Sequence, residues 1–87
     1  MVRENLADAS DLLASVETTG DAAERLDGLA EQLETLATAE RGPDHGRLAR
    51  LQTALGEVKE QVDDDAAATI DEALEAIVAY RETVDGV

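Results

Sequence analysis

The residues that decide the fold are 41–46, RGPDHG, near the middle of an 87-residue chain that is otherwise acidic and rich in Ala and Leu. These six residues include the single Pro and the single His of the sequence and two of its six Gly. Gly42 can end a helix in a left-handed conformation, and Pro43 directly after it prevents that helix from continuing. Asp44 is a natural N-cap for a new helix. We therefore predict that the chain passes here from one helix to the next.

Two further breaks divide the rest of the chain. Gly20 can end a first helix, and Asp21 then fits an N-cap that Glu24 completes as a capping box. Three consecutive carboxylates, at 63–65, interrupt the apolar pattern, and one of them should cap a last helix that ends at Gly86. The expected helices lie near residues 3–18, 21–40, 45–62 and 65–84.

Each of these segments carries apolar residues three and four positions apart, which is the spacing of one face of a helix, and none alternates like a strand. Such a seam suits helices that pack nearly parallel or antiparallel to one another. The seam residues are Leu6, Ala9, Leu13 and Val16; Leu26, Leu29, Leu33 and Leu36; Leu48, Leu51, Leu55, Val58 and Val62; and Ile70, Ala73, Ile77, Tyr80 and Val84.

The connections between the four segments are short, so consecutive helices should be antiparallel neighbours. We predict an all-α fold, an antiparallel up-down-up-down four-helix bundle that forms a single domain over residues 1–87. The alternative is two helical hairpins that complete their core by dimerisation, because narrow seams are compatible with both arrangements. Tyr80 is the single aromatic residue, so the core must consist mainly of Leu, Val, Ile and Ala.

Composition and motifs argue against several classes of site. The chain has no Cys, which excludes disulfides and thiolate metal sites. It has no run of about 18 apolar residues that could cross a membrane, and its N-terminus lacks the apolar segment of a signal peptide, so we expect a cytoplasmic protein. It contains no Gly-rich phosphate loop, no Glu-x-x-His metal motif and no nucleophile with a His base. We therefore expect no enzymatic activity, no cofactor and no bound metal.

The charge is strongly acidic but unevenly distributed. The formal net charge of −14 is typical of a salt-accumulating cytoplasm, because molar salt shortens the Debye length to about 3 Å and screens self-repulsion. Nucleic-acid binding is disfavoured, since the chain has no basic face and no aromatic platform. Residues 41–62 carry four positive against three negative side chains, whereas residues 1–40 carry two against ten and residues 63–87 one against eight. The helix expected over 45–62 is thus the one that is not acidic.

Three arginines, Arg41, Arg47 and Arg50, contribute most of this difference and allow two interpretations. They could form a site for an anion or nucleotide together with the free N–H groups at the start of the helix over 45–62. Alternatively, they pair with Asp and Glu of neighbouring helices or of an acidic partner, which is the more common role of Arg in such a chain. His45 has no second His with which to bind a metal, so we expect a solvent-facing turn residue.

A stripe of small residues runs along the same expected helix, beside its Leu seam, and consists of Gly46, Ala49, Thr53 and Gly56. Gly inside a helix costs up to about 1 kcal/mol relative to Ala, so we expect a packing reason for Gly56. This small-residue stripe would permit close approach of another helix, either a neighbour in the same bundle or a second copy of the chain. Both interpretations rest on the same packing physics and stay open at this point.

Two stretches, GPDHGRLAR at 42–50 and AYRETVDGV at 79–87, resemble a family of short acidic helical proteins from haloarchaea to which no function is assigned. The resemblance covers nearly the whole chain. It implies a haloarchaeal, cytoplasmic, stand-alone domain, and it transfers no catalytic or binding residue.

We predict from these observations a non-enzymatic interaction module that binds a second copy of itself or another protein, with neither nucleic acid nor membrane as a partner. Its contact surface should comprise Arg41, Gly46, Arg47, Ala49, Arg50, Thr53 and Gly56. The alternative is a regulator that binds a small anion or nucleotide through Arg41, Arg47 and Arg50.

Overall fold

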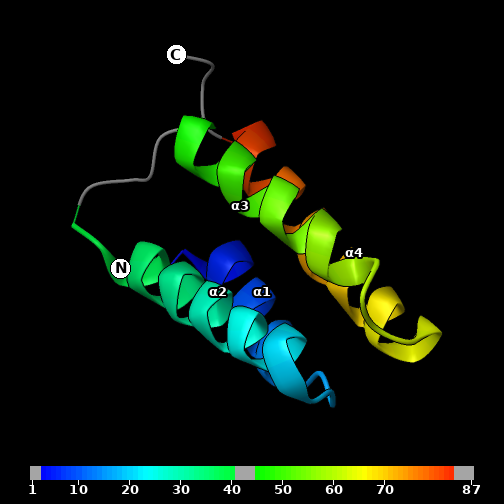
Figure 1. The fold of residues 1–87 in the computed structure, drawn as a ribbon. Helices are drawn as coiled ribbons and strands as arrows, with labels where there is room; N and C mark the ends of the chain where they lie inside the picture. The colour runs from blue at the N-terminus through cyan, green and yellow to red at the C-terminus, as the bar shows by residue number, and fades with distance from the viewer. Residues whose placement is uncertain (1–2, 41–44, 84–87) are drawn as a thin grey trace.

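The computed structural model describes residues 3–40 and 45–83 of the chain. These residues form four helices and no strand: α1 (Glu4–Ala14), α2 (Gly20–Thr38), α3 (His45–Lys59) and α4 (Asp64–Thr83). The helices lie side by side in a compact body of 35 × 19 × 17 Å (Figure 1). The all-α prediction is confirmed, and the arrangement is consistent with a four-helix bundle.

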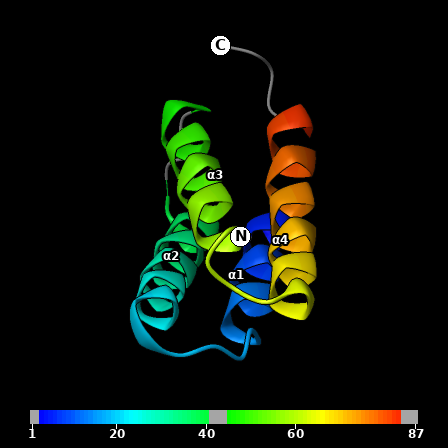
Figure 2. The same ribbon diagram turned by 45° about the vertical axis from the view of Figure 1, so that its right-hand side comes forward.

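Neighbouring helices run in opposite directions along the bundle (Figures 1 and 2). The start of α1 lies at the end of α2, where the backbone N–H of Arg3 donates to the carbonyl oxygen of Ala37 at 2.9 Å. The end of α3 lies at the start of α4, where the Nζ of Lys59 is 2.7 Å from Oδ1 of Asp71. The path of the chain is therefore up-down-up-down, as the short connections predict.

Each helix packs side by side with two others, and within the described part of the chain the diagonally placed helices share no such interface. Helix α1 has extensive interfaces with both α2 and α4, although α4 is the most distant helix in the sequence. Helix α3 packs less extensively on α4, and α2 and α3 share the smallest of the four interfaces. Of the two diagonally placed helices α1 and α3, α1 is thus the more deeply embedded.

The core consists of the seams that the periodicity predicts. Eight apolar side chains are essentially fully buried: Leu6, Leu13, Leu33, Leu48, Leu55, Val58, Ile70 and Ile77. All four helices contribute to this set, so one chain encloses its core without needing a second hairpin pair. Val16, Val62 and Tyr80 are partly buried at the edge of the core, and Val84 lies outside the described residues.

Helix α1 ends earlier than predicted. It stops at Ala14 instead of near residue 18, and the hydroxyl of Ser15 donates to the carbonyl oxygen of Leu12 at 2.7 Å. Three β-branched residues, Val16, Thr18 and Thr19, follow closely, and such residues lose χ1 freedom in a helix. The residues between α1 and α2 therefore form a connection instead of another helical turn.

Gly20 adopts the left-handed conformation, with φ of +73°, but at the start of α2 and not at the end of α1. The N-cap is Thr19, and its side chain forms no capping hydrogen bond. The capping box predicted for Asp21 and Glu24 is therefore wrong, because Asp21 already lies in the first helical turn. A carboxylate in that turn still interacts favourably with the helix dipole.

The carboxylate run before α4 behaves as predicted. The backbone N–H of Ala66 donates to Oδ1 of Asp63 at 2.9 Å, so Asp63 caps α4.

Helix α3 ends at Lys59, three residues before the predicted position. The roles predicted for Gly42, Pro43, Asp44 and Gly86 fall outside the described residues.

Candidate functional site

The candidate site is the outward surface of α3, whose inner surface belongs to the core. Leu48, Leu51, Leu55 and Val58 are at most 4% exposed, as the Leu seam requires. On the small-residue stripe, in contrast, Gly46 and Thr53 are exposed and Ala49 and Gly56 are only half-buried. The stripe therefore faces largely away from the three other helices.

Gly56 shows most directly that the bundle does not use this stripe. A Cβ atom placed on Gly56 would meet nothing within 4 Å outside its own helix backbone and chain neighbours. The hydroxyl of Thr53 donates to the carbonyl oxygen of Ala49 at 3.1 Å and so is bonded within α3 itself. Close approach of a neighbouring helix of the same bundle therefore does not explain Gly56.

Two predicted arginines, Arg47 and Arg50, are exposed on the first half of α3, whereas Arg41 lies outside the described residues. They border a shallow hollow of about 210 Å³ between α2 and α3. Its other lining residues are Leu29, Gln32, Leu51 and Ala54. Four other hollows on the described surface are lined by at least two carboxylates each and by no cation. The structure thus brings Arg47 and Arg50 together at the least extensive helix interface.

Two ion pairs join α3 to neighbouring helices. Arg25 of α2 is 3.2 Å from Glu57 of α3, and Lys59 is 2.7 Å from Asp71 of α4. Arg50 forms no ion pair with any other described residue. The interpretation of Arg50 as a structural partner of a neighbouring helix is therefore not supported.

His45 is half-buried, so its predicted solvent-facing position is wrong. Its Nδ1 accepts a hydrogen bond of 3.0 Å from Nε of Arg81 near the end of α4. The same guanidinium donates through Nη1 to Oε1 of Gln52 at 2.5 Å. Nε2 of His45 is buried and has no hydrogen-bond partner among residues 3–40 and 45–83. Arg81 thus links the first two turns of α3 to the last turn of α4.

Sequence reasoning missed this link, although one signal was present. His45 and Gln52 are seven residues apart, which places them on the same face of α3. Nothing in the pattern indicates that Arg81, on a helix expected to run antiparallel to α3, reaches both of them. The link holds α3 in place, and it leaves the outward surface of α3 uncovered.

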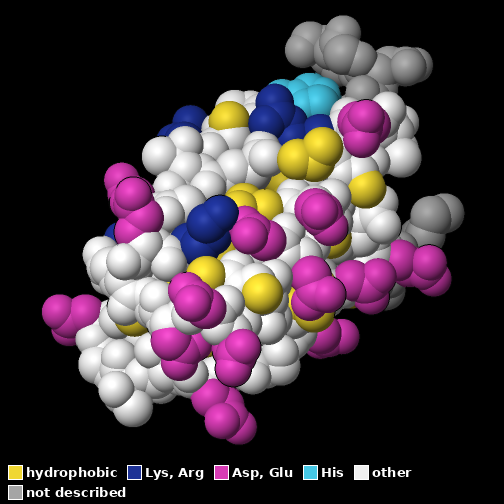
Figure 3. Space-filling model, turned by 90° about the vertical axis from the view of Figure 1, so that its right-hand side faces the viewer, with side chains coloured by type: hydrophobic (Ala, Val, Ile, Leu, Met, Phe, Trp, Pro, Cys, Tyr) yellow, Lys and Arg dark blue, Asp and Glu magenta, His cyan; other side chains and the backbone are white. Residues whose placement is uncertain are grey.

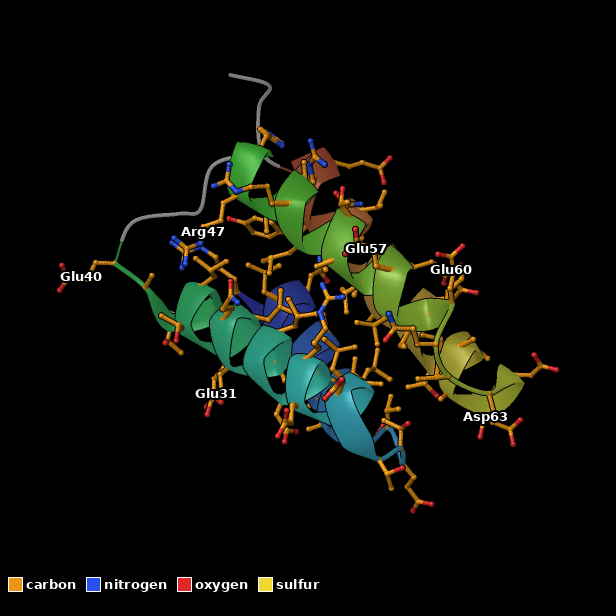
Figure 4. The ribbon with its side chains drawn as sticks, in the orientation of Figure 1. Glu31, Glu40, Arg47, Glu57, Glu60 and Asp63 are labelled. Carbon is orange, nitrogen blue, oxygen red and sulfur yellow. The ribbon has the colours of Figure 1, made fainter. Side chains whose placement is uncertain are left out.

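The exposed charges of α3 change sign along the helix. Arg47 lies at its start, whereas Glu57 and Glu60 lie at its other end, Glu60 directly after the last helical residue (Figure 4). On the face that Figure 3 shows, cationic side chains lie beside the cyan His at one end, and carboxylates are spread over most of the rest, with a further cationic side chain among them. The outward surface of α3 itself bears Arg47 and Arg50 on its first half and carboxylates at its far end, with small residues between them.

Residues 1–83 match a family that is described as a family of unknown function, DUF7553. The chain belongs to this family. No curated protein and no solved structure matches this DUF7553 chain. The family description assigns no activity, so the function of this DUF7553 chain has to be inferred from its geometry.

Metal sites and membrane spans are two other kinds of feature that a helical chain such as this DUF7553 protein could contain. No group of three or more His, Cys, Asp or Glu side chains within residues 3–40 and 45–83 is placed to hold a metal ion. No helix in this part of the chain combines the length and the apolar character needed to cross a membrane.

The buried hydroxyl of Ser10 donates to the carbonyl oxygen of Ala30 at 2.8 Å, which gives it a role in packing α1 on α2.

Proposed function

We propose that the chain is a non-enzymatic interaction module that associates through the outward surface of α3, with a second copy of itself or with another protein. The observation that carries the proposal is the uncovered row of small residues on α3, with open space beside Gly56, in a helix whose opposite face is fully packed. The proposed contact surface comprises Arg41, Gly46, Arg47, Ala49, Arg50, Thr53 and Gly56.

The cost of Gly56 supports this proposal. Gly in a helix interior is less favourable than Ala by up to about 1 kcal/mol, because it loses more backbone entropy on folding. Nothing within the bundle offsets that cost, since an added Cβ would meet no atom within 4 Å. A partner helix would offset it, because small residues let two helix backbones approach closely and gain dispersion contacts.

The solvent in which the module works is part of the proposal. A net charge of −14 on 87 residues and the resemblance to haloarchaeal proteins support a high-salt archaeal cytoplasm. Two such chains repel each other at low ionic strength, and molar salt screens this repulsion to a range of about 3 Å. Lowering KCl to about 0.1 M extends the range to about 10 Å and should lower the melting temperature. A melting temperature that stays constant over this interval would contradict the high-salt proposal.

The experiment that tests self-association is a measurement of molecular mass in molar KCl over a range of protein concentrations. The Gly56→Ala substitution should shift the chain towards monomer, because the added methyl group separates the paired helices. Gly28→Ala is the matched control, since Gly28 also lies in a helix with no atom within 4 Å of an added Cβ. The control should associate like the unsubstituted chain. A strict monomer at high micromolar concentration would rule out the homodimer.

The hollow between α2 and α3 favours a second candidate function, a regulator that binds a small anion or nucleotide. Two guanidinium groups, of Arg47 and Arg50, border this hollow together with the amide of Gln32. Guanidinium groups bind carboxylate and phosphate through paired hydrogen bonds. Titration with phosphate and with nucleotides should then shift the amide resonances of Gly46 and Arg47. Absence of any shift at millimolar ligand would exclude this candidate.

A further inference from the structure

The exposed charges of α3 have a consequence for how a partner can bind there. The first half of the outward surface bears Arg47 and Arg50, and the far end bears Glu57 and Glu60. Glu57 already pairs with Arg25 of its own chain at 3.2 Å. Arg50 and Glu60 are both exposed and form no ion pair with other described residues. Helix α3 and the residue directly after it therefore present an exposed cation and an exposed anion that have no ion-pair partner among the described residues.

A second copy of the chain fits this pattern in one orientation. If two α3 helices pack in parallel, Arg50 faces Arg50 and Glu60 faces Glu60, and like charges meet at both ends. If they pack antiparallel, each Arg50 comes beside the Glu60 of the other copy. Such a surface is complementary to itself, which is what a two-fold symmetric interface requires. Contacts of opposite charge fix the orientation of an interface even where they add little to its affinity.

The spacing of the two residues agrees with the position of the small residues. Arg50 and Glu60 are ten positions apart, or about 15 Å along a helix. The midpoint between them falls at residue 55, between the exposed Thr53 and the half-buried Gly56. The two-fold axis would therefore pass where side chains are small and the partner backbone can approach most closely.

We propose that two copies of the chain associate through α3 in antiparallel orientation, with Arg50 of each copy paired with Glu60 of the other. This inference rests on the proposed self-association and adds its orientation and its pairing. The interface closes on itself, so it produces a dimer and not a filament. The hollow beside α2 stays outside the closest contact, because Leu51 and Ala54 face α2 instead of the partner.

Charge reversal tests the pairing. In molar KCl, Arg50→Glu and Glu60→Arg should each weaken the dimer by about threefold or more, because the two-fold symmetry replaces two contacts of opposite charge at once, and the double variant should restore it. Net charge cannot produce this result, because the two single substitutions change it in opposite directions. Glu31→Arg is the matched control for Glu60→Arg, since Glu31 is exposed on α2 and directed away from α3 (Figure 4). The control should leave the dimer unchanged.

Cross-linking tests the orientation, and the absence of native Cys makes the result unambiguous. In the antiparallel dimer, the two copies of residue 53 lie within about 6 Å along the helices, and the two copies of residue 49 about 18 Å apart. Thr53→Cys should therefore form an interchain disulfide on oxidation, and Ala49→Cys should not, because a disulfide joins Cα atoms about 4–7 Å apart. Cross-linking of both variants would show a parallel dimer and overturn the inference.

The remaining outcomes separate this inference from the proposed function. A dimer that Gly56→Ala weakens but that both charge reversals leave intact would overturn the Arg50–Glu60 pairing and leave self-association standing. A monomeric unsubstituted chain in molar KCl would overturn the inference and self-association, and would leave another protein as the partner of the proposed function. A dimer insensitive to substitutions on α3 would place the interface elsewhere and overturn the inference and the proposed function.

Discussion

Helices α1 and α3 occupy diagonal positions in the bundle, yet they are held by different kinds of interaction. Helix α1 packs extensively on both neighbours, and its polar links are buried or part-buried hydrogen bonds to backbone carbonyls. Helix α3 has smaller interfaces, and its ion pairs are exposed. Its part-buried link, from Arg81 to His45 and Gln52, joins side chains and not backbone carbonyls. Helix α1 is therefore enclosed by two extensive interfaces, whereas part of the surface of α3 is left for other contacts.

The Arg3 guanidinium illustrates how α1 is held. Its Nη1 donates to the carbonyl oxygens of Leu36 at 2.9 Å and Ala39 at 2.7 Å. These carbonyls are among the last of α2, which have no partner within their own helix, and a cation there also interacts favourably with the helix dipole. The ion pairs of α3 are weaker contacts, because side chains that are 39–59% exposed remain largely solvated.

The largest expected effect comes from truncating one core leucine in each helix. Leu6 in α1 and Leu55 in α3 are both 0% exposed, and each substitution by Ala should cost about 2–5 kcal/mol. The cost of Leu6→Ala should lie nearer the upper end of this range, because the well-packed surroundings of Leu6 collapse less around the cavity. Urea unfolding in molar KCl measures both values. An equal or larger cost at Leu55 would contradict the conclusion that α1 is packed more extensively than α3.

A smaller effect is expected from the polar links. Arg3→Ala should lower the free energy of unfolding by about 1.5–3 kcal/mol, because two part-buried carbonyls lose a charged donor. Lys59→Ala removes the exposed pair with Asp71 and should cost less than about 1 kcal/mol. Urea unfolding in molar KCl gives the free energy of unfolding of both variants. Equal values would show that the hydrogen bonds of Arg3 to the end of α2 stabilise α1 no more than the exposed ion pair stabilises α3.

Next in size are substitutions at three glycines. Gly28→Ala and Gly56→Ala should each stabilise the isolated chain by up to about 1 kcal/mol, because a Cβ at either position meets open space. Gly20→Ala should instead destabilise it by about 1–2 kcal/mol, since a φ of +73° is unfavourable for a residue with a Cβ. Thermal unfolding at low protein concentration, where association is negligible, gives these values. Destabilisation by Gly56→Ala would mean that the outward surface of α3 is already packed.

The smallest effect concerns the contact between α2 and α3. A double-mutant cycle on Arg25 and Glu57 should give a coupling of about 0.2–1 kcal/mol at low salt, and less in molar KCl. Unfolding of the two single variants and the double variant provides the coupling. A value well above 1 kcal/mol would show that this interface is stronger than its exposed contacts indicate.

Periodicity predicts the helices and the core of this chain because both depend on local spacing. The inward seams of α2 and α3 from Leu26 to Leu36 and from Leu48 to Val58 are buried as expected. The end of α1 is mispredicted, because the Leu13–Val16 spacing continues the seam past the point where the helix stops. A seam shows which side chains can be buried and does not show where backbone hydrogen bonding ends.

The polar contacts could be predicted only in part. The charge change along α3 is visible in the sequence, and so is the exposed stripe beside its Leu seam. The links of Arg3 to the end of α2 and of Arg81 to His45 join residues more than 30 positions apart. Such pairings depend on the relative height and rotation of antiparallel helices, which neither spacing nor composition specifies. They became apparent only when the helices were placed in space.

The packing of α1 on α4 affects how the chain can fold during synthesis. The end of α1 at Ala14 and the start of α4 at Asp64 are 50 positions apart in the sequence. A nascent chain that has left the ribosome only as far as α3 can form the α1–α2 hairpin but cannot cover the other side of α1. Contacts this distant in sequence raise the contact order and slow folding relative to a bundle closed by local hairpins alone. Completion of the core therefore waits for the last helix, and the nascent hairpin exposes apolar surface until then.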